Sequence, residues 1–536
     1  MTATIQTLLL MLIALVAVAF AARKLRTAPS ILLVLVGIAL AVTPGLPAIE
    51  LAPEFVLLII LPPLIYSAGV SMSWREFKSN LRPIALLAVG CVVFTTCTVA
   101  VVAHYLFGLP WAVGFVLGAI VAPPDVVAPL AIARRLNLPR RLRVILEGEG
   151  LANDATALIL YRFAVAAVAT GSFSIGPALG TFSIIVIGEI IFGVGVGWLS
   201  LRLRRWVHDA RAEITLSLAT PYLAFWIPEH LGGSGVLATV ACGLYVSWNG
   251  PLLIGSSTRL QGIFFWDLFI YLIEGFVFLI TGLQANTVLA RIQGYSLREI
   301  IAAIAITTLL LMITRFVWVF PATYLPRWFS PSLKRRDPSP PWKLPFMISF
   351  IGIRGIVSLA AALALPLALN NGDPFPGRDL ILVITFGVIV ATLVGLGLIL
   401  PFVVRLVGLA GEGEKERQRE LSDELVARLE AMQFGQRHLD EIAAQHELPE
   451  KVFSVLRNHY ADRLQLLPKS FDDSFDEIVL GTSLRIQLIA EERKYLHRLL
   501  REGRITDEAR RRVERELDLE EATINTAMER DGYTPL

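Results

Sequence analysis

Three carboxylates stand in an apolar stretch of this sequence, where only a specific chemical role would favour them. The segment RVILEGEGLANDATALILYRFAVAAVA, residues 143–169, carries Glu147, Glu149 and Asp154. Ionised side chains lose hydration in apolar surroundings, and inside membrane spans they mark ion or proton pathways. Carboxylate oxygens are also ligands that hard metal cations prefer. The segment therefore predicts a site that binds a proton or a hard cation.

Two other charged residues are expected at the depth of Asp154. With a helical rise of about 1.5 Å per residue, Asp154 lies about 16 Å into a layer of about 30 Å, counted from the nearest basic helix end. The same count places Asp125 at about 14 Å, Arg354 at about 16 Å and Glu149 at about 9 Å. Charged groups from three separate helices are thus predicted to converge near the middle of a membrane.

Two of these helices carry residues that interrupt a helix. Pro123 and Pro124 precede Asp125, and two glycines, Gly352 among them, flank Arg354. Proline removes a backbone donor, and non-helical backbone at mid-membrane is tolerated only where it is buried in protein or lines a cavity. Interrupted spans in matching positions of two inverted halves are typical of the binding site of a secondary transporter. The alternative is a pair of kinked structural helices with a packing ion pair.

Composition places the whole chain among membrane proteins. It has 536 residues, 55% hydrophobic and 17% charged, with a mean hydropathy of +0.64. Spans of about 20 apolar residues cross a bilayer, and we expect about thirteen transmembrane helices in an all-α fold. They are predicted at 4–22, 30–44, 51–70, 83–107, 110–133, 143–169, 177–200, 212–228, 235–248, 261–284, 298–325, 344–369 and 379–409. The interrupted spans are the fifth and the twelfth, which therefore run in opposite directions as crossed, broken helices of inverted repeats.

The loops between these spans predict the orientation. Those on one side hold 21 Lys and Arg residues, and those on the other side hold three. Basic loops are typically cytoplasmic. No basic residues precede the first apolar run, which argues against a cleaved signal peptide. We expect a multi-pass protein of a bacterial inner (plasma) membrane, with its N-terminus outside and its C-terminal domain in the cytoplasm.

The charge distribution predicts two domains. Residues 1–410 hold 28 basic and 17 acidic residues, whereas residues 411–536 hold 20 and 28. The first part is the predicted membrane domain, and the second a cytoplasmic helical domain with a regulatory or oligomerisation role. The second part is net acidic and has no phosphate loop, nucleotide fingerprint or metal motif, which argues against a nucleic-acid partner. The three cysteines and seven histidines show no disulfide or metal-ligand spacing.

Several motifs resemble those of one transporter family, the NhaP/NHE-type cation:proton antiporters (monovalent cation:proton antiporter family 1). EGLAND, residues 149–154, is similar to that family's ESLLND motif, and PPDVVA, residues 123–128, to its TDPVA or PPDAVA segment. GIRGIVSLAAALALP, residues 352–366, is similar to its GLRGAVSLALAL helix. The resemblance covers about residues 5–410. It implies a bacterial Na⁺/H⁺ antiporter with membrane lipid around it, a homodimer, and no bound cofactor beyond the transported cation and H⁺.

The resemblance also implies roles for individual residues. Asp154 would bind the cation and the proton in turn, with Asn153 beside it. Asp125 would belong to the unwound crossing, together with the interrupted backbone. Glu149 and Arg354 would form an ion pair between helices near the site.

This sequence departs from the family pattern at two positions. Gly150 stands where many members have Ser, and Pro124 stands where many have Thr, so two oxygen ligands are missing and backbone carbonyls or water would replace them. Glu274 is either an additional polar site or a packing residue. Glu189 and Arg315 also lie near mid-membrane, where we expect structural pairing.

These residues and the family resemblance together imply a transport mechanism. A buried carboxylate that holds either a proton or an alkali cation exchanges one for the other, and with Asn153 as its neighbour the exchange is electroneutral, one for one, in pH and sodium homeostasis. Alternating access would come from rocking of core spans, residues 83–169 and 298–409, against dimerisation spans, residues 4–70 and 177–284. Asp154 would hold Na⁺, or alternatively K⁺ or Rb⁺.

Two other classes of protein use similar residues. A cation channel also lines its path with midplane oxygens but passes cations without counter-flow of protons. An intramembrane aspartyl protease uses two mid-membrane aspartates, but the crowding by Arg354, Glu149 and the double proline argues against it. We therefore expect a transporter and not an enzyme.

Overall fold

The structure is a computed structural model of the whole chain. It describes residues 2–25, 27–43, 52–125, 127–171, 174–207, 209–289, 296–369, 372–445, 449–465, 475–502 and 504–530. Helices dominate these residues, which contain no strand and one isolated β-bridge, between Ala368 and Pro374. The chain divides into two compact units, Met1–Glu414 and Lys415–Leu536.

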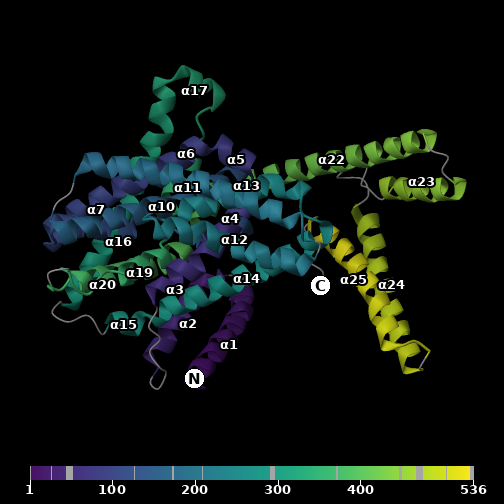
Figure 1. The fold of residues 1–536 in the computed structure, drawn as a ribbon, viewed down its shortest axis with the longest axis horizontal. Helices are drawn as coiled ribbons and strands as arrows, with labels where there is room; N and C mark the ends of the chain where they lie inside the picture. The colour runs from purple at the N-terminus through teal and green to yellow at the C-terminus, as the bar shows by residue number, and fades with distance from the viewer. Residues whose placement is uncertain are drawn as a thin grey trace. The chain divides into compact units, whose positions relative to one another are not determined.

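The first unit is a bundle of long apolar helices (Figure 1). In chain order its helices are α1 (Thr2–Leu25), α2 (Pro29–Val42), α3 (Pro53–Phe55), η1 (Val56–Ile60), α4 (Leu61–Ser71), α5 (Trp74–Ser79), α6 (Leu81–Ala85), η2 (Leu86–Cys91), α7 (Val92–Phe107), α8 (Trp111–Val121), α9 (Val127–Arg135), α10 (Arg140–Thr170), α11 (Ile175–Arg204), α12 (Ala210–His230), α13 (Val236–Asn249), η3 (Gly250–Leu252), α14 (Ser256–Leu283), α15 (Ala285–Leu289), α16 (Leu297–Phe329), α17 (Pro331–Arg336), α18 (Lys343–Phe350), α19 (Ile356–Leu363), α20 (Arg378–Val390), η4 (Ala391–Leu396) and α21 (Gly397–Val407).

Seven helical segments among the described residues are long and apolar enough to cross a membrane. They are Pro53–Ser71, Leu81–Phe107, Arg140–Thr170, Gly176–Arg204, Ser256–Val288, Leu297–Phe329 and Arg378–Val407. Three shorter apolar helices, Pro29–Val42, Trp111–Val121 and Val236–Leu252, add to them. The chain is therefore a multi-pass membrane protein, and the count of thirteen spans stays a prediction.

Glycines allow several of these helices to approach closely. A Cβ at Gly37 of α2 would lie 2.3 Å from a backbone oxygen of α14, and one at Gly282 of α14 would lie 2.3 Å from a backbone oxygen of α2. Gly69 of α4 and Gly243 of α13 meet in the same way, each facing backbone atoms of the other helix. Small residues at helix contacts are typical of membrane bundles, where close backbone packing stabilises the association. α2 and α14, and likewise α11 and α13, lie side by side in Figure 1.

Two helices are interrupted where the sequence predicts breaks. α8 ends at Val121, immediately before Ala122 and the two prolines, and α9 starts at Val127. Proline lacks the N–H that would continue the helix, so two successive prolines remove two helical hydrogen bonds. α18 ends at Phe350, and α19 starts at Ile356 after a non-helical stretch with two glycines. Each interruption leaves helix ends inside the bundle, with backbone groups that need partners.

The second unit is helical as well. α22 (Ala410–Gln445) runs into it, followed by α23 (Glu450–Gln465), α24 (Phe475–Arg501) and α25 (Asp507–Arg530). α24 and α25 pack around a small core of Ile489, Leu517 and Ile524. Ion pairs line this contact, from Arg485 to Glu520 and from Arg493 to Asp518 and Glu521.

Candidate functional site

The two interrupted helices meet at their breaks. The backbone N–H of Asp125, between α8 and α9, donates to the carbonyl of Ile353, between α18 and α19, over 2.7 Å. A Cβ at Gly355 would lie 2.4 Å from Oδ2 of Asp125, so the carboxylate packs directly on this glycine. The breaks are therefore in contact, and four helix ends gather at one place in the bundle.

Arg354 stabilises the carboxyl end of α8 at this crossing. Its side chain, 1% exposed, donates from Nε to the carbonyl of Val121 over 2.9 Å and from Nη2 to that of Ala122 over 3.3 Å. Its Nη1 donates to the carbonyl of Gly352, just beyond α18. Helix carboxyl ends carry partial negative charge and leave carbonyls without intrahelical partners. One guanidinium therefore satisfies the carbonyls freed at both breaks.

Asp125 has the complementary role at the amino ends of the other two half-helices. Its Oδ1 accepts from the backbone N–H of Val127, the first residue of α9, over 3.1 Å. Gly355, against which it packs, immediately precedes α19. Helix amino ends carry partial positive charge, which a carboxylate stabilises. The charges of Asp125 and Arg354 are thus matched to the helix ends of the crossing.

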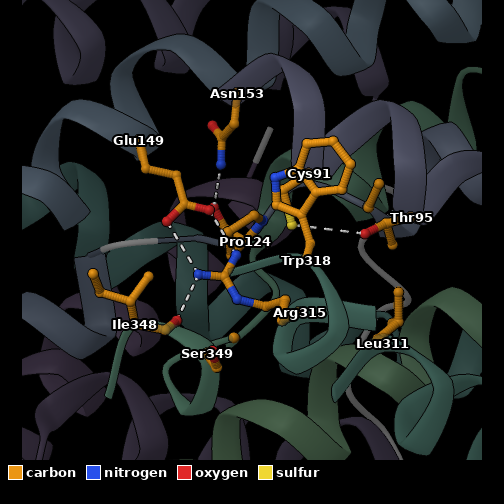
Figure 2. A network of polar contacts seen from close by, with 12 residues as sticks. Cys91, Thr95, Pro124, Glu149, Asn153, Leu311, Arg315, Trp318, Ile348 and Ser349 are labelled. Atoms are coloured by element: carbon orange, nitrogen blue, oxygen red, sulfur yellow. Dashed lines mark hydrogen bonds and ion pairs between the residues drawn. The ribbon is translucent and has the colours of Figure 1, made fainter. Parts of the chain in front are cut away.

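The α10 residues Asn153 and Asp154 face this crossing. Asn153 is fully buried, and its Nδ2 donates to the carbonyl of Pro124 over 2.8 Å (Figure 2). Its Oδ1 accepts no hydrogen bond from the described residues. Asp154 is half-buried and interacts electrostatically with Asp125. No hydrogen bond or ion pair reaches the Asp154 carboxylate from the part of the chain that the structure describes.

The expected ion pair of Glu149 with Arg354 is wrong. The partner of Glu149 is Arg315 of α16, which donates from Nη1 to Oε1 over 2.6 Å and from Nη2 to Oε2 over 3.1 Å (Figure 2). Both side chains are almost fully buried, and Arg315 also donates to the carbonyl of Ile348 over 2.8 Å. Arg354 instead donates its hydrogen bonds to the carbonyls at the helix ends. The structural pairing expected for Arg315 is confirmed.

Gly352 lies between the two arginines. A Cβ there would approach Nη1 of Arg354 to 2.9 Å and Cδ of Arg315 to 3.0 Å, so the absent side chain leaves room for both. The carbonyls of Val121, Ala122 and Pro124, which lie where the first helix is interrupted, accept bonds from Arg354 and Asn153.

The sequence did not predict one further residue at the crossing, Thr392, and it predicted only general roles for Glu189 and Glu274. Thr392 of η4 accepts from the backbone N–H of Arg354 over 3.1 Å, and nothing in its apolar sequence context signals this. Glu189, for which structural pairing was expected, accepts from the backbone N–H groups of Ser234, Gly235 and Leu237 at the start of α13. Glu274 is half-buried in α14, and its role stays open between a polar site and packing.

The crossing has the composition of a site for one small cation or proton. Within the described part of the chain it presents one carboxylate that accepts no hydrogen bond, near a buried amide oxygen and a second carboxylate, while Arg354 donates to backbone carbonyls and Arg315 to Glu149. The family model described as "Sodium/hydrogen exchanger, transmembrane" matches residues 10–406. The chain belongs to this family.

Relatives within the sodium/hydrogen exchanger family match over most of the chain. The uncharacterized Na(+)/H(+) exchanger Rv2287 of Mycobacterium tuberculosis is 33% identical and covers 94% of this chain and 92% of its own length. The sodium, potassium, lithium and rubidium/H(+) antiporter of Bacillus pumilus is 34% identical, over 68% of this chain and 56% of its own. The Na(+)/H(+) antiporter ApNhaP of Aphanothece halophytica is 32% identical, over 77% and 75%.

A solved structure shows the same fold. The sodium proton antiporter MjNhaP1 of Methanocaldococcus jannaschii matches with a TM-score of 0.57 at 19% identity, covering 76% of this chain and 100% of its own. The predicted all-α antiporter fold and the predicted family are therefore confirmed, and the family is one of transporters.

Proposed function

We propose that Asp154 is the carrier of an exchanger that trades one monovalent cation, Na⁺ in the first place, for one proton. The observation that supports this is its position. Asp154 is half-buried beside the meeting point of two broken helices, and the other charged groups there have partners in the protein. An ionised carboxylate in such surroundings is costly unless a proton or a cation neutralises it.

The charges at the crossing favour exchange of one ion for one proton. Glu149 and Arg315 compensate each other in a bidentate pair. Asp125 and Arg354 serve the helix ends with opposite charges. Asp154 then leaves one negative charge, which one H⁺ or one alkali cation cancels equally well. Because Asn153 cannot titrate, the loaded site is neutral in both halves of the cycle, and exchange is electroneutral.

The choice of cation follows from the same residues and from relatives. Hydroxyl ligands are missing at Gly150 and Pro124, and the Pro124 carbonyl accepts a bond from Asn153. Few fixed protein ligands around a monovalent cation favour weak discrimination by size. The B. pumilus relative is named for sodium, potassium, lithium and rubidium, and the A. halophytica relative for sodium. We propose Na⁺ as the main substrate, with K⁺ and Rb⁺ as the alternative.

Its setting follows from the topology. We propose that the protein works in a bacterial plasma membrane, for pH and sodium homeostasis. In this proposal the basic loops and the C-terminal unit lie in the cytoplasm, because basic loops are typically cytoplasmic. The N-terminus then lies outside. We further propose a homodimer that associates through spans 4–70 and 177–284.

A reconstitution experiment tests the exchange. Purified protein is placed in acid-loaded proteoliposomes, and an internal pH dye records proton release after addition of Na⁺, Li⁺, K⁺ or Rb⁺. We expect proton release with Na⁺ and an unchanged rate when a thiocyanate gradient imposes a membrane voltage. Cation uptake without proton release would indicate a channel, and a voltage-dependent rate would contradict the one-for-one stoichiometry.

A further inference from the structure

Three arginines from the ends of three membrane helices gather around a single aspartate. Arg82 lies at the start of α6, Arg141 in the first turn of α10 and Arg327 in the last turn of α16. Asp337, directly after α17, accepts from Nη2 of Arg141 over 2.7 Å and from Nη2 of Arg327 over 2.5 Å. Nη1 of Arg82 lies 3.9 Å from its Oδ2.

This cluster has more positive than negative charge. One carboxylate faces three guanidinium groups, and its hydrogen bonds come from two of them. Burial alone would raise the pKa of the Asp337 carboxyl, but the bonds from Arg141 and Arg327 bring that pKa below its usual value. Asp337 is therefore ionised at neutral pH, and the three arginines carry about two positive charges more than Asp337 neutralises.

The cluster also has donors without acceptors. Nε and Nη1 of Arg82 and Nε of Arg141 are inaccessible to solvent and donate to no atom of the described residues. A donor shielded from solvent is destabilising when it has no acceptor, and more so when the group is charged. Three such atoms in one cluster can donate to an acceptor that has several oxygens.

A cavity lies where that acceptor would bind. Its volume is about 30 Å³, and its lining includes Arg82, Arg141 and Arg327. One water needs about 10–15 Å³ by the same measure, so two oxygen atoms of a larger group fit inside the cavity. The side chains of Arg82 and Arg141 are 31% and 37% exposed, so the rest of such a group stays in contact with solvent. The rest of the lining is mainly apolar, including Leu86 and Val319. Because the charged groups of the lining are the guanidiniums of Arg82, Arg141 and Arg327, an anionic group fits this cavity better than a cation.

We propose that this cavity binds a phosphate group through Arg82 and Arg141. Guanidinium groups bind phosphate oxygens through parallel, charge-assisted hydrogen bonds, which suits the unpartnered donors. The cluster lies at the ends of apolar helices on the side with the basic loops, which is where lipid phosphates are expected if these helices span a membrane. The phosphate therefore comes either from an anionic phospholipid headgroup or from free phosphate in solution.

Bound phosphate would connect α6 to two helices that carry the transport machinery. α10 carries Asp154 and α16 carries Arg315, so the ligand would fix the ends of the helices that hold the carboxylate and its neighbouring ion pair. The binding itself does not depend on the proposed exchange, because the site lies at the helix ends and not at the crossing.

Ligand-dependent thermal stability of the delipidated, full-length protein tests the site. A ligand that binds only the folded state raises its melting temperature. The probes are short-chain phosphatidylglycerol, short-chain phosphatidylcholine, whose headgroup is zwitterionic, and inorganic phosphate. We expect phosphatidylglycerol or inorganic phosphate to raise the melting temperature and phosphatidylcholine to leave it unchanged. A response to phosphatidylglycerol alone identifies a lipid headgroup as the source, and an equal response to phosphate identifies the free ion.

Arg82→Gln is the decisive variant, because it removes two of the three unpartnered donors and keeps both short bonds to Asp337. We expect it to weaken binding about tenfold or more, the loss of two charge-assisted hydrogen bonds. Arg82→Lys keeps the charge but not the paired donors, so its affinity for phosphate is expected to lie between those of the wild type and Arg82→Gln. Arg140→Gln is the matched control, since Arg140 pairs with Glu76 and does not line the cavity.

Two results would overturn the proposal. One is a wild-type melting temperature that neither phosphatidylglycerol nor inorganic phosphate raises, or that phosphatidylcholine raises as much as they do. The other is an equal loss of binding in Arg82→Gln and Arg140→Gln, which would indicate unspecific attraction to positive charge. Since direct binding of radiolabelled phosphate or lipid to the same samples does not require a stability change, it decides the case if Arg82→Gln itself lowers the melting temperature.

Discussion

Asp154 differs from the other charged residues of the crossing because it has no hydrogen-bonded partner among the described residues. Asp125 accepts a backbone N–H and Glu149 accepts two bonds from Arg315. A carboxylate held in this way cannot bind a proton or a cation without losing those hydrogen bonds. A carboxylate that makes none can alternate between a proton and a cation at little structural cost.

Replacing Asp154 by Asn should therefore abolish exchange and leave the fold intact. The amide has the shape of the acid but cannot bind a proton or neutralise a cation. The substitution removes no hydrogen bond to the described residues, so the fold should be retained. Proton release from acid-loaded proteoliposomes should fall to the level of empty vesicles, with a melting temperature close to that of the wild type. Asp267→Asn, the same change at an exposed position of α14, should keep full activity. Exchange that survives in purified Asp154→Asn would refute the assignment.

Substitutions in the pair of Glu149 and Arg315 should affect primarily the stability of the fold. Both charges are buried and neutralise each other through two hydrogen bonds. Removing one partner of a buried ion pair leaves an uncompensated charge and costs about 3–5 kcal/mol. Glu149→Gln and Arg315→Gln should each lower the melting temperature strongly, and the double variant should be more stable than the sum of the two losses predicts. Additive losses would show that the pair is not coupled.

At the scale of helices, the sequence predicted the interruptions well and the side-chain partners poorly. Pro123 and Pro124 end α8 through local chemistry, and glycines beside Arg354 allow the second break, so both could be read from neighbouring residues. The partner of Glu149 depends on how α10 and α16 are rotated about their axes, which is set by packing over the whole bundle. Depth along a helix could not separate Arg315 from Arg354, because both lie near mid-membrane.

A second ion pair on α10 connects the predicted core spans to the predicted dimerisation spans. Arg162, two helical turns beyond Asp154, pairs with Glu229 at the end of α12 and donates to the carbonyl of Gly233. Glu189 fixes the following loop by accepting backbone N–H groups at Ser234 and further along α13. If the core rocks against the other spans, this contact on the predicted outer side must break and re-form in every cycle.

Neutralising this pair should therefore shift the balance between the two access states. A partly exposed ion pair contributes up to about 1 kcal/mol, so Arg162→Gln or Glu229→Gln should change the apparent KM for the cation two- to fivefold. The swap Arg162→Glu with Glu229→Arg should restore part of the wild-type value. Lys343→Gln is the control, because Lys343 pairs with Glu412 and both flank core spans. An unchanged KM in both single variants would show that the contact does not control access.

For the whole molecule, the distribution of basic residues predicts one orientation in the membrane. The loops assigned to one side hold 21 basic residues, and those on the other side hold three. An error of one span would exchange the sides of all following loops, so a pair of positions tests the predicted spans up to the second of them. Ser174, before α11, is expected outside, and Ser257, at the start of α14, is expected inside; both are exposed.

Cysteines at these two positions should react differently with a membrane-impermeant thiol reagent. Cys97 is exposed in the structure, whereas Cys91 and Cys242 are buried, so the variants are made on a Cys97→Ser background. On intact cells, Ser174→Cys should be labelled and Ser257→Cys should react only after the membrane is permeabilised. The parent without added cysteine controls for the buried thiols. The opposite pattern would place the arginine cluster around Asp337 outside the cell and would reverse the side from which Arg162 and Glu229 close the path to Asp154.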